Sequence, residues 1–220
     1  MNVELKKRFL TSFFLITLLF AMYNYSFIMI VSLIIIGIIT WVEFYALISK
    51  IILSNTLKSK FLRFLFKALS LLYLSLLIFF IIIAESYYLN LKPYFIYTLL
   101  VAIFSDIGGL VFGKFFKGKK LTKISPNKTI SGSIGSFILP LSLVPFFHAV
   151  LINYDSLTLI MITILISLTT QLGDLFISYL KRKAKVKHTS NILPGHGGFL
   201  DRIDGVIFAI PAGIFLFNFI

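Results

Sequence analysis

The sequence predicts an all-α integral membrane protein, and three features of its 220 residues support this fold class. Hydrophobic residues make up 59% of the chain and charged residues only 13%, whereas globular chains are about 45–50% apolar and about 25% charged. The mean hydropathy of +1.00 is too high for one water-facing domain of this size. The apolar residues also gather in runs that are long enough to cross a bilayer.

Seven such runs predict about seven transmembrane helices, because a crossing takes roughly 20 mainly apolar residues. They cover residues 9–23, 27–49, 68–84, 93–113, 133–152, 157–180 and 199–220. The first run is short and follows three basic residues, so a secretory signal peptide is the alternative for this segment. No small-x-small cleavage pattern follows it, and we therefore expect a helical hairpin with the second run.

The basic residues predict the orientation of these helices. Nineteen of the 21 lysines and arginines lie at the N-terminus or in the loops after the second, fourth and sixth runs. Basic residues concentrate on cytoplasmic loops, so we expect the N-terminus and these loops in the cytoplasm and the C-terminus outside. The net charge of +13 then reflects topology in the cell (inner) membrane, and no nucleic-acid partner is expected.

The chain is expected to form a single polytopic membrane domain over residues 1–220. Residues 1–92 carry only hydrophobicity and are interpreted as scaffold spans, and residues 93–220 are interpreted as the catalytic half. The absence of cysteine excludes disulfides, thiolate metal ligands and cysteine nucleophiles.

The eight acidic residues indicate where a functional site lies. Four of them, including Glu43 near the end of the second run, are explained by solvated or interfacial positions. The other four, Asp106, Asp174, Asp201 and Asp204, lie in or at the edge of a predicted span. A charged side chain at the bilayer centre costs about 2.5–3.5 kcal/mol on insertion scales, so it marks a function or has a salt-bridge partner.

Three of these carboxylates are predicted to converge at the cytoplasmic side. Asp201 and Asp204 are three residues apart and would share one face of a helix. Asp174 lies near the cytoplasmic end of the preceding span. Since Mg²⁺ is held by one or two carboxylates together with substrate phosphates, the pattern predicts a magnesium site for a phosphorylated substrate.

Two polar loops on the same side are suited to phosphate. Residues 194–198 read Pro-Gly-His-Gly-Gly directly before a predicted helix, and glycines allow backbone N–H groups to approach an anion. A tight turn is the alternative for a glycine-rich segment taken alone. The second loop runs from Lys123 through Lys128 and Thr129 to Gly135 and combines lysines, hydroxyls and glycines.

These motifs resemble the phosphatidate cytidylyltransferase (CDP-diacylglycerol synthase) family. The resemblance rests on Ser178-Tyr-Leu-Lys181-Arg182, on Lys187, and on residues 192–204, which contain His-Gly-Gly-Phe-Leu-Asp-Arg-Ile-Asp. Asp174 within Gln-Leu-Gly-Asp, the loop from Lys123 to Thr129 and the position of Asp106 also match. The similarity covers roughly residues 104–210.

The resemblance implies an enzyme that joins CTP to phosphatidic acid and releases pyrophosphate for phospholipid synthesis. It implies Mg²⁺, with a monovalent cation left open, bound by Asp174, Asp201 and Asp204, and these with Lys181 are the implied catalytic residues. The implied substrate-binding residues are Lys128, Thr129, Ser178, Arg182, His196, Gly197, Gly198 and Arg202. Membrane lipids are further expected partners, and a homodimer is left open.

The chain departs from the family pattern where His188 and Ser131 replace the usual carboxylates and where Ile177 stands at a position that is often acidic. Two alternatives remain. A cation- or proton-coupled transporter would explain aspartates inside spans but not the Pro-Gly-His-Gly-Gly loop. Another CTP-dependent lipid enzyme, such as a polyprenol kinase, would share the metal chemistry.

Overall fold

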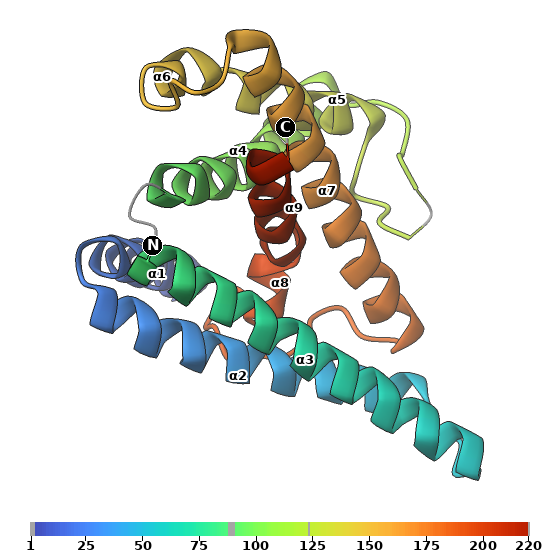
Figure 1. Cartoon of the computed structure of the whole chain (residues 1–220). Helices are drawn as coiled ribbons and strands as arrows, with labels where there is room; N and C mark the ends of the chain where they lie inside the picture. The colour runs from blue at the N-terminus through green and yellow to red at the C-terminus, as the bar shows by residue number, and fades with distance from the viewer. Residues whose placement is uncertain (1–2, 88–90, 123, 220) are drawn as a thin grey trace. The chain divides into compact units, whose positions relative to one another are not determined.

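The computed structural model describes residues 3–87, 91–122 and 124–219, which form helices joined by loops (Figure 1). The helices are α1 (Val3–Asn24), α2 (Ser26–Ile51), α3 (Leu57–Tyr87), α4 (Lys92–Phe116), α5 (Ile130–Leu141), α6 (Val144–His148), α7 (Ser156–Lys183), α8 (Leu200–Ile203) and α9 (Val206–Phe219). Within these described ranges there is no strand, only two isolated β-bridges. The predicted all-α class is confirmed.

Five helical segments among the described residues are long and apolar enough to cross a membrane. They are Ser26–Ile51, Leu57–Glu85, Lys92–Phe116, Ile130–His148 and Ser156–Lys183. They correspond to the second to sixth predicted spans, so a multi-pass membrane protein is confirmed. The first and last predicted spans fall on α1 and on the short α8 and α9. The count of seven and the cytoplasmic N-terminus stay predictions.

Two predicted spans are not continuous helices. The span predicted over 199–220 is broken after α8, because residues Asp204 and Gly205 form a turn before α9 begins at Val206. Asp204 therefore does not lie on a helix with Asp201, as the i, i+3 spacing predicted. The span predicted over 133–152 is interrupted between α5 and α6, where Pro145 lacks the N–H that a continuous helix needs.

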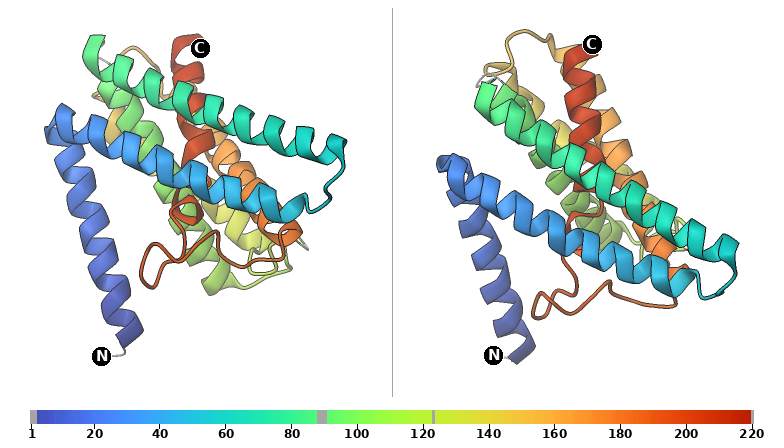
Figure 2. Two further views of the ribbon diagram at one scale, coloured as in Figure 1. Left: turned by 90° about the horizontal axis from the view of Figure 1, so that it is seen from below. Right: turned by 60° about the horizontal axis from the view of Figure 1, so that its bottom comes forward.

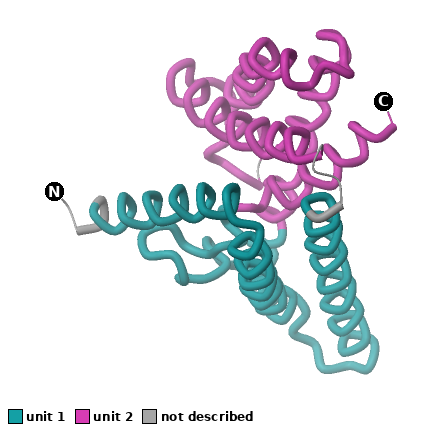
Figure 3. The backbone as a smooth tube through the Cα atoms, turned by 60° about the vertical axis from the view of Figure 1, so that its left-hand side comes forward, with its two compact units in different colours: residues 1–87, 180–202 teal, residues 88–179, 203–220 magenta. Residues whose placement is uncertain are grey.

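The chain divides into two compact units (Figure 3). Unit 1 contains residues 1–87 and 180–202, and unit 2 contains residues 88–179 and 203–220. This division differs from the halves 1–92 and 93–220 that the sequence suggests, because the loop with the Pro-Gly-His-Gly-Gly sequence packs with the N-terminal helices. Whether the chain acts as one membrane domain stays a prediction.

Unit 1 is built around α2, which packs against both α1 and α3. Figure 2 shows α2 and α3 side by side in both views. Gly37 of α2 faces Ile78 of α3 so closely that a Cβ atom at residue 37 would overlap the Ile78 side chain. A glycine at this position lets the two helices pack tightly.

Unit 2 is built around α4, which packs against α5 and α9. Gly108 of α4 and Gly135 of α5 bring the two backbones into contact, because a Cβ at Gly135 would lie 2.7 Å from the Gly108 carbonyl oxygen and would overlap Phe112. Small residues at helix contacts are typical of proteins packed in lipid, where close backbone approach replaces the hydrophobic driving force. The core beside this contact includes Tyr97 and Ile162, both fully buried.

Replacing Gly135 with Val should force α4 and α5 apart. Overpacking of this kind costs about 1–3 kcal/mol, so the detergent-purified variant should melt several degrees below the parent protein. Ile134→Val, on the exposed side of the same helix, is the matched control and should melt as the parent does. Equal melting temperatures for all three proteins would contradict the close packing of these helices.

Candidate functional site

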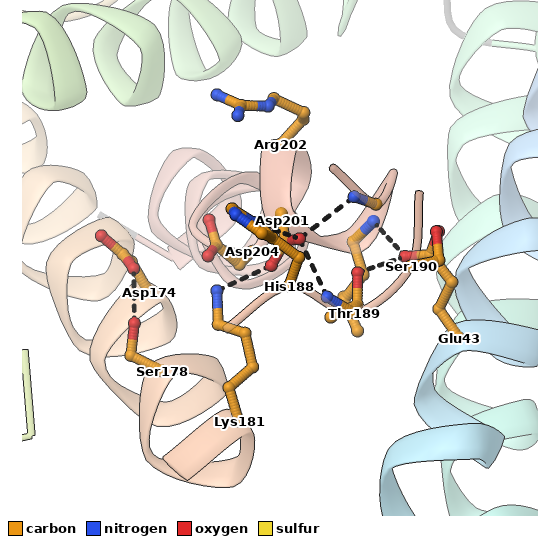
Figure 4. Close-up of polar contacts among 12 residues, drawn as sticks. Glu43, Asp174, Ser178, Lys181, His188, Thr189, Ser190, Asp201, Arg202 and Asp204 are labelled. Atoms are coloured by element: carbon orange, nitrogen blue, oxygen red, sulfur yellow. Dashed lines mark hydrogen bonds and ion pairs between the residues drawn. The ribbon is translucent and has the colours of Figure 1, made fainter. Parts of the chain in front are cut away.

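Glu43 of α2 holds the glycine-rich loop of unit 1. Its side chain is buried, with 2% relative exposure, and its carboxylate accepts four hydrogen bonds, two of them from Thr189 and Ser190, which Figure 4 labels. Oε1 accepts from the Ser190 hydroxyl at 2.6 Å and from the Phe199 N–H at 2.9 Å. Oε2 accepts from the Thr189 hydroxyl at 2.7 Å and from the Leu200 N–H at 2.8 Å. Each oxygen therefore binds one hydroxyl and one backbone amide.

This geometry corrects the solvated or interfacial role that the sequence suggested for Glu43. A buried carboxylate is costly unless hydrogen bonds compensate it, and four donors do so here. The only local signal was an acid between Val42 and Phe44 in an apolar stretch, which does not identify its partners. Those partners lie 146 to 157 residues further along the chain, which no local pattern reveals.

Asp201 is the second carboxylate that organises this loop. Its Oδ1 accepts from the Lys181 ammonium at 2.8 Å, and both side chains are largely buried. Its Oδ2 accepts from the backbone N–H groups of Thr189 at 3.0 Å and Gly198 at 3.1 Å, and His188 Nδ1 lies 3.6 Å away. Asp201 and Lys181, both predicted from the sequence, are thus brought together.

The glycines of the loop allow close contact with these carboxylates. Gly197 has a φ of +89°, and a Cβ there would lie 3.1 Å from Asp201 Oδ2. A Cβ at Gly198 would lie 2.6 Å from Glu43 Oε2. The amides of His196 and Gly197 donate to the Leu193 carbonyl, and that of Gly198 donates to Asp201. These amides thus bind the chain's own oxygens, and their predicted binding of phosphate stays a prediction.

His196 lies at the tip of the same loop, against α1. Its Nε2 is 3.4 Å from the Ser12 hydroxyl, and its backbone carbonyl accepts from the Arg202 guanidinium at 2.6 Å. Nearby, the Thr11 hydroxyl donates to the Pro194 carbonyl. Burial and the positive charges of Arg202 and Arg8 lower the pKa of His196 below its ordinary value. The site therefore favours the neutral form of the imidazole.

In unit 2, Asp174 forms the centre of another charged cluster. It forms an ion pair with Lys128, and its Oδ1 accepts from the Ser178 hydroxyl one helical turn away at 3.2 Å. Asp106 of α4 interacts electrostatically with both Asp174 and Lys128. The structure thus brings together Lys128, Asp174 and Ser178, three of the predicted site residues, and adds Asp106, which the sequence marked as an acid inside a span and as a match to the family pattern but did not assign to the site.

The remaining predicted residues have distinct positions. Thr129 caps α5, because its hydroxyl accepts from the Gly132 N–H at 3.1 Å, and the Ser131 hydroxyl donates to the Lys117 carbonyl. Arg182 is exposed near the end of α7. Asp204 is buried at the break before α9. Gly173 of α7 packs against its backbone, because a Cβ atom added at Gly173 would lie 2.9 Å from the Asp204 carbonyl oxygen. Lys123 lies outside the described residues.

The donor atoms fit a hard divalent cation, although the described residues contain no group of three His, Asp or Glu side chains placed to hold one. Asp174 forms an ion pair with the Lys128 ammonium. Asp201 Oδ1 accepts from Lys181, and a carboxylate oxygen can accept a second partner as well. Asp201 belongs to unit 1 and Asp174 and Asp204 to unit 2, so their predicted convergence on a metal stays a prediction.

Comparison with known proteins identifies relatives. The cytidylyltransferase family model matches residues 2–220. The chain is 42% identical over 148 residues to a phosphatidate cytidylyltransferase of Rickettsia typhi, covering 63% of this chain and 62% of that protein. It is 43% identical over 123 residues to a protein of the same name from Staphylococcus aureus, covering 54% of this chain and 46% of that protein. The chain thus spans roughly half to three-fifths of these curated relatives.

Replacing Glu43 with Gln should loosen the loop, because a glutamine amide cannot accept on both sides. Its NH₂ group can donate to the Thr189 or Ser190 hydroxyl, but one backbone N–H, of Phe199 or Leu200, would lose its acceptor. An unsatisfied buried donor costs about 1–3 kcal/mol, which corresponds to at least about fivefold faster amide exchange by local opening. Hydrogen–deuterium exchange of peptides covering residues 186–200 measures this directly.

Glu85→Gln is the matched control, since it removes the same charge from unit 1 at a residue that accepts a hydrogen bond from Ser26. It should leave exchange of residues 186–200 unchanged. If the Glu43→Gln protein exchanged there at the parent rate, Glu43 would not be the anchor of the loop.

Proposed function

Because the chain belongs to the cytidylyltransferase family, we propose that it joins CTP to phosphatidic acid, producing CDP-diacylglycerol and pyrophosphate. The relatives named phosphatidate cytidylyltransferase support this substrate pair. The observation that carries the proposal is the pairing of two signature aspartates with lysines, Asp201 with Lys181 and Asp174 with Lys128. Carboxylates suit a metal ion, and lysines suit the phosphates that the metal accompanies.

The reaction requires positioning and charge neutralisation more than covalent help. A phosphate oxygen of phosphatidic acid attacks the α-phosphorus of CTP, and the bond from that phosphorus to the oxygen bridging to the β-phosphate breaks. Pyrophosphate leaves with the bonding electrons. The attacking phosphate is already an anion at neutral pH, so no general base is needed.

The residues of the chain have separate roles in this proposal. Lys181 and Lys128 neutralise phosphate charge, supported by Arg182 and Arg202. Ser178 orients Asp174, and Thr129 fixes the start of α5 next to Lys128. Glu43 is a positioning residue, since its buried carboxylate holds the segment that carries His196, Gly197 and Gly198.

Asp174, Asp201 and Asp204 would hold Mg²⁺, with a monovalent cation as an optional second ion. When bound, Mg²⁺ would neutralise charge that develops on the phosphates. The oxygen-only donor set and the lysine beside Asp174 support this assignment. The open capacity of Asp201 Oδ1 is consistent with it.

We further propose that the site faces the cytoplasm at the inner membrane, as the basic loops indicate. A homodimer is compatible with this arrangement. Family membership does not favour the transporter alternative, and a polyprenol kinase remains the alternative that the assay must separate.

Purified chain with Mg²⁺, labelled CTP and phosphatidic acid should yield labelled CDP-diacylglycerol and pyrophosphate. Chelation of divalent ions should stop product formation, and added Mg²⁺ should restore it. A parallel reaction with a polyprenol should give no phosphorylated polyprenol and no CDP. Product from the polyprenol alone, or none from folded protein with phosphatidic acid across several divalent ions, would refute the proposed activity.

Asp174→Asn should lower kcat by about 100-fold or more, because it removes a charge from a site that works by electrostatic positioning. The asparagine keeps an oxygen for the Ser178 hydroxyl, so the protein should still fold. Asp155→Asn, an exposed acid just before the same helix, is the control and should retain full activity. Turnover that survives in Asp174→Asn at saturating Mg²⁺ would remove Asp174 from the metal site.

A further inference from the structure

A groove of about 650 Å³ lies between α2 and α3 in unit 1. Trp41 and Tyr45 of α2 line it together with Lys60, Arg63, Phe64 and Lys67 of α3. None of these residues belongs to the loop site or to the family signature. The groove combines aromatic rings with three positive charges.

Hydrogen bonds and ring contacts fix the positions of these side chains. The Lys67 ammonium lies 3.2 Å from the centroid of the Tyr45 ring, and the Trp41 indole N–H donates to the Lys67 carbonyl at 3.1 Å. The Arg63 guanidinium lies 3.3 Å from the Ser54 carbonyl and from Asn55 Oδ1. The groove therefore has defined walls.

Three cations line the groove without an ion pair to an acid in the described part of the chain. Among the described residues, no carboxylate forms an ion pair with Lys60, Arg63 or Lys67. Glu43 lies two residues from both Trp41 and Tyr45, which is about 200° around the axis of α2. Its carboxylate is hydrogen-bonded to the glycine-rich loop and so faces away from the groove. Like charges gathered beside apolar walls favour an anionic ligand.

The length of α3 places these cations near the headgroups of a bilayer. Its 31 residues extend about 46 Å, whereas the hydrocarbon core is about 30 Å thick. About ten residues therefore extend beyond the core, and the basic residues of α3 all lie in its first eleven positions. Trp and Tyr are enriched at this depth.

We propose that this groove binds an anionic phospholipid of the surrounding bilayer. The phosphate would contact Lys60, Arg63 and Lys67, and the acyl chains would follow the apolar side of α3 past Phe64 and Leu71. Basic pockets between membrane helices suit anionic lipid headgroups. Apolar walls favour a lipid over a free anion. Because the groove and Glu43 lie on opposite faces of α2, this lipid site is separate from the loop site and does not depend on the proposed reaction.

Trp41 is the only tryptophan in the chain, so its fluorescence reports on the groove alone. The full chain is reconstituted in phosphatidylcholine nanodiscs with a small fixed fraction of lipid brominated in its acyl chains, either phosphatidylglycerol or phosphatidylcholine. Since each basic residue near the surface favours an anionic lipid by about fivefold, brominated phosphatidylglycerol should quench Trp41 several times more strongly than brominated phosphatidylcholine.

The triple variant Lys60→Gln/Arg63→Gln/Lys67→Gln should lose this preference, and Lys60→Gln alone should lose part of it while disturbing no wall contact. The matched control Lys7→Gln/Lys50→Gln/Lys58→Gln removes the same charge from unit 1 outside the groove and should keep the preference. Equal quenching by both lipids in the parent protein would overturn the proposal. An equal loss of the preference in the control variant would also overturn it. So would a preference that inorganic phosphate abolishes but chloride of the same ionic strength does not, because that result would indicate a site for free anions.

Discussion

The buried carboxylate of Glu43 is the interaction on which the rest of unit 1 depends. It is a charge removed from water, and four hydrogen bonds from the loop and from the start of α8 compensate it. Those bonds fix the segment between Thr189 and Leu200. Asp201 follows immediately and gathers two further amides and Lys181, so the two carboxylates order the loop from both sides.

Each unit contains an aspartate that forms an ion pair with a lysine. Asp201 is neutralised by Lys181 in unit 1, and Asp174 by Lys128 in unit 2. Neither lysine is adjacent in sequence to its aspartate, and each pair joins a helix to a loop or to another helix. These two acids are tolerable in an otherwise apolar protein because each has a lysine beside it.

Much of this arrangement could be predicted from the sequence, because composition and apolar runs determine five of the spans and the scarcity of acids marks Asp174 and Asp201. Other features depend on tertiary contacts. The break at Asp204 and Gly205 reflects close packing of Gly205 on Thr170 of α7, which no helical periodicity reveals. The role of Glu43 was missed because its hydrogen-bond partners lie more than 140 residues away in the sequence.

The position of Glu43 also means that the chain is not modular. Its relatives align over only part of its length, and the motifs that resemble the family lie in the second half. This distribution suggests a catalytic segment that could fold without the first half. A fragment that began after α3 would carry every signature residue yet leave two hydroxyls and two amides without their acceptor. The second half is enough to recognise the family, but its glycine-rich loop depends on Glu43 of α2 for its structure.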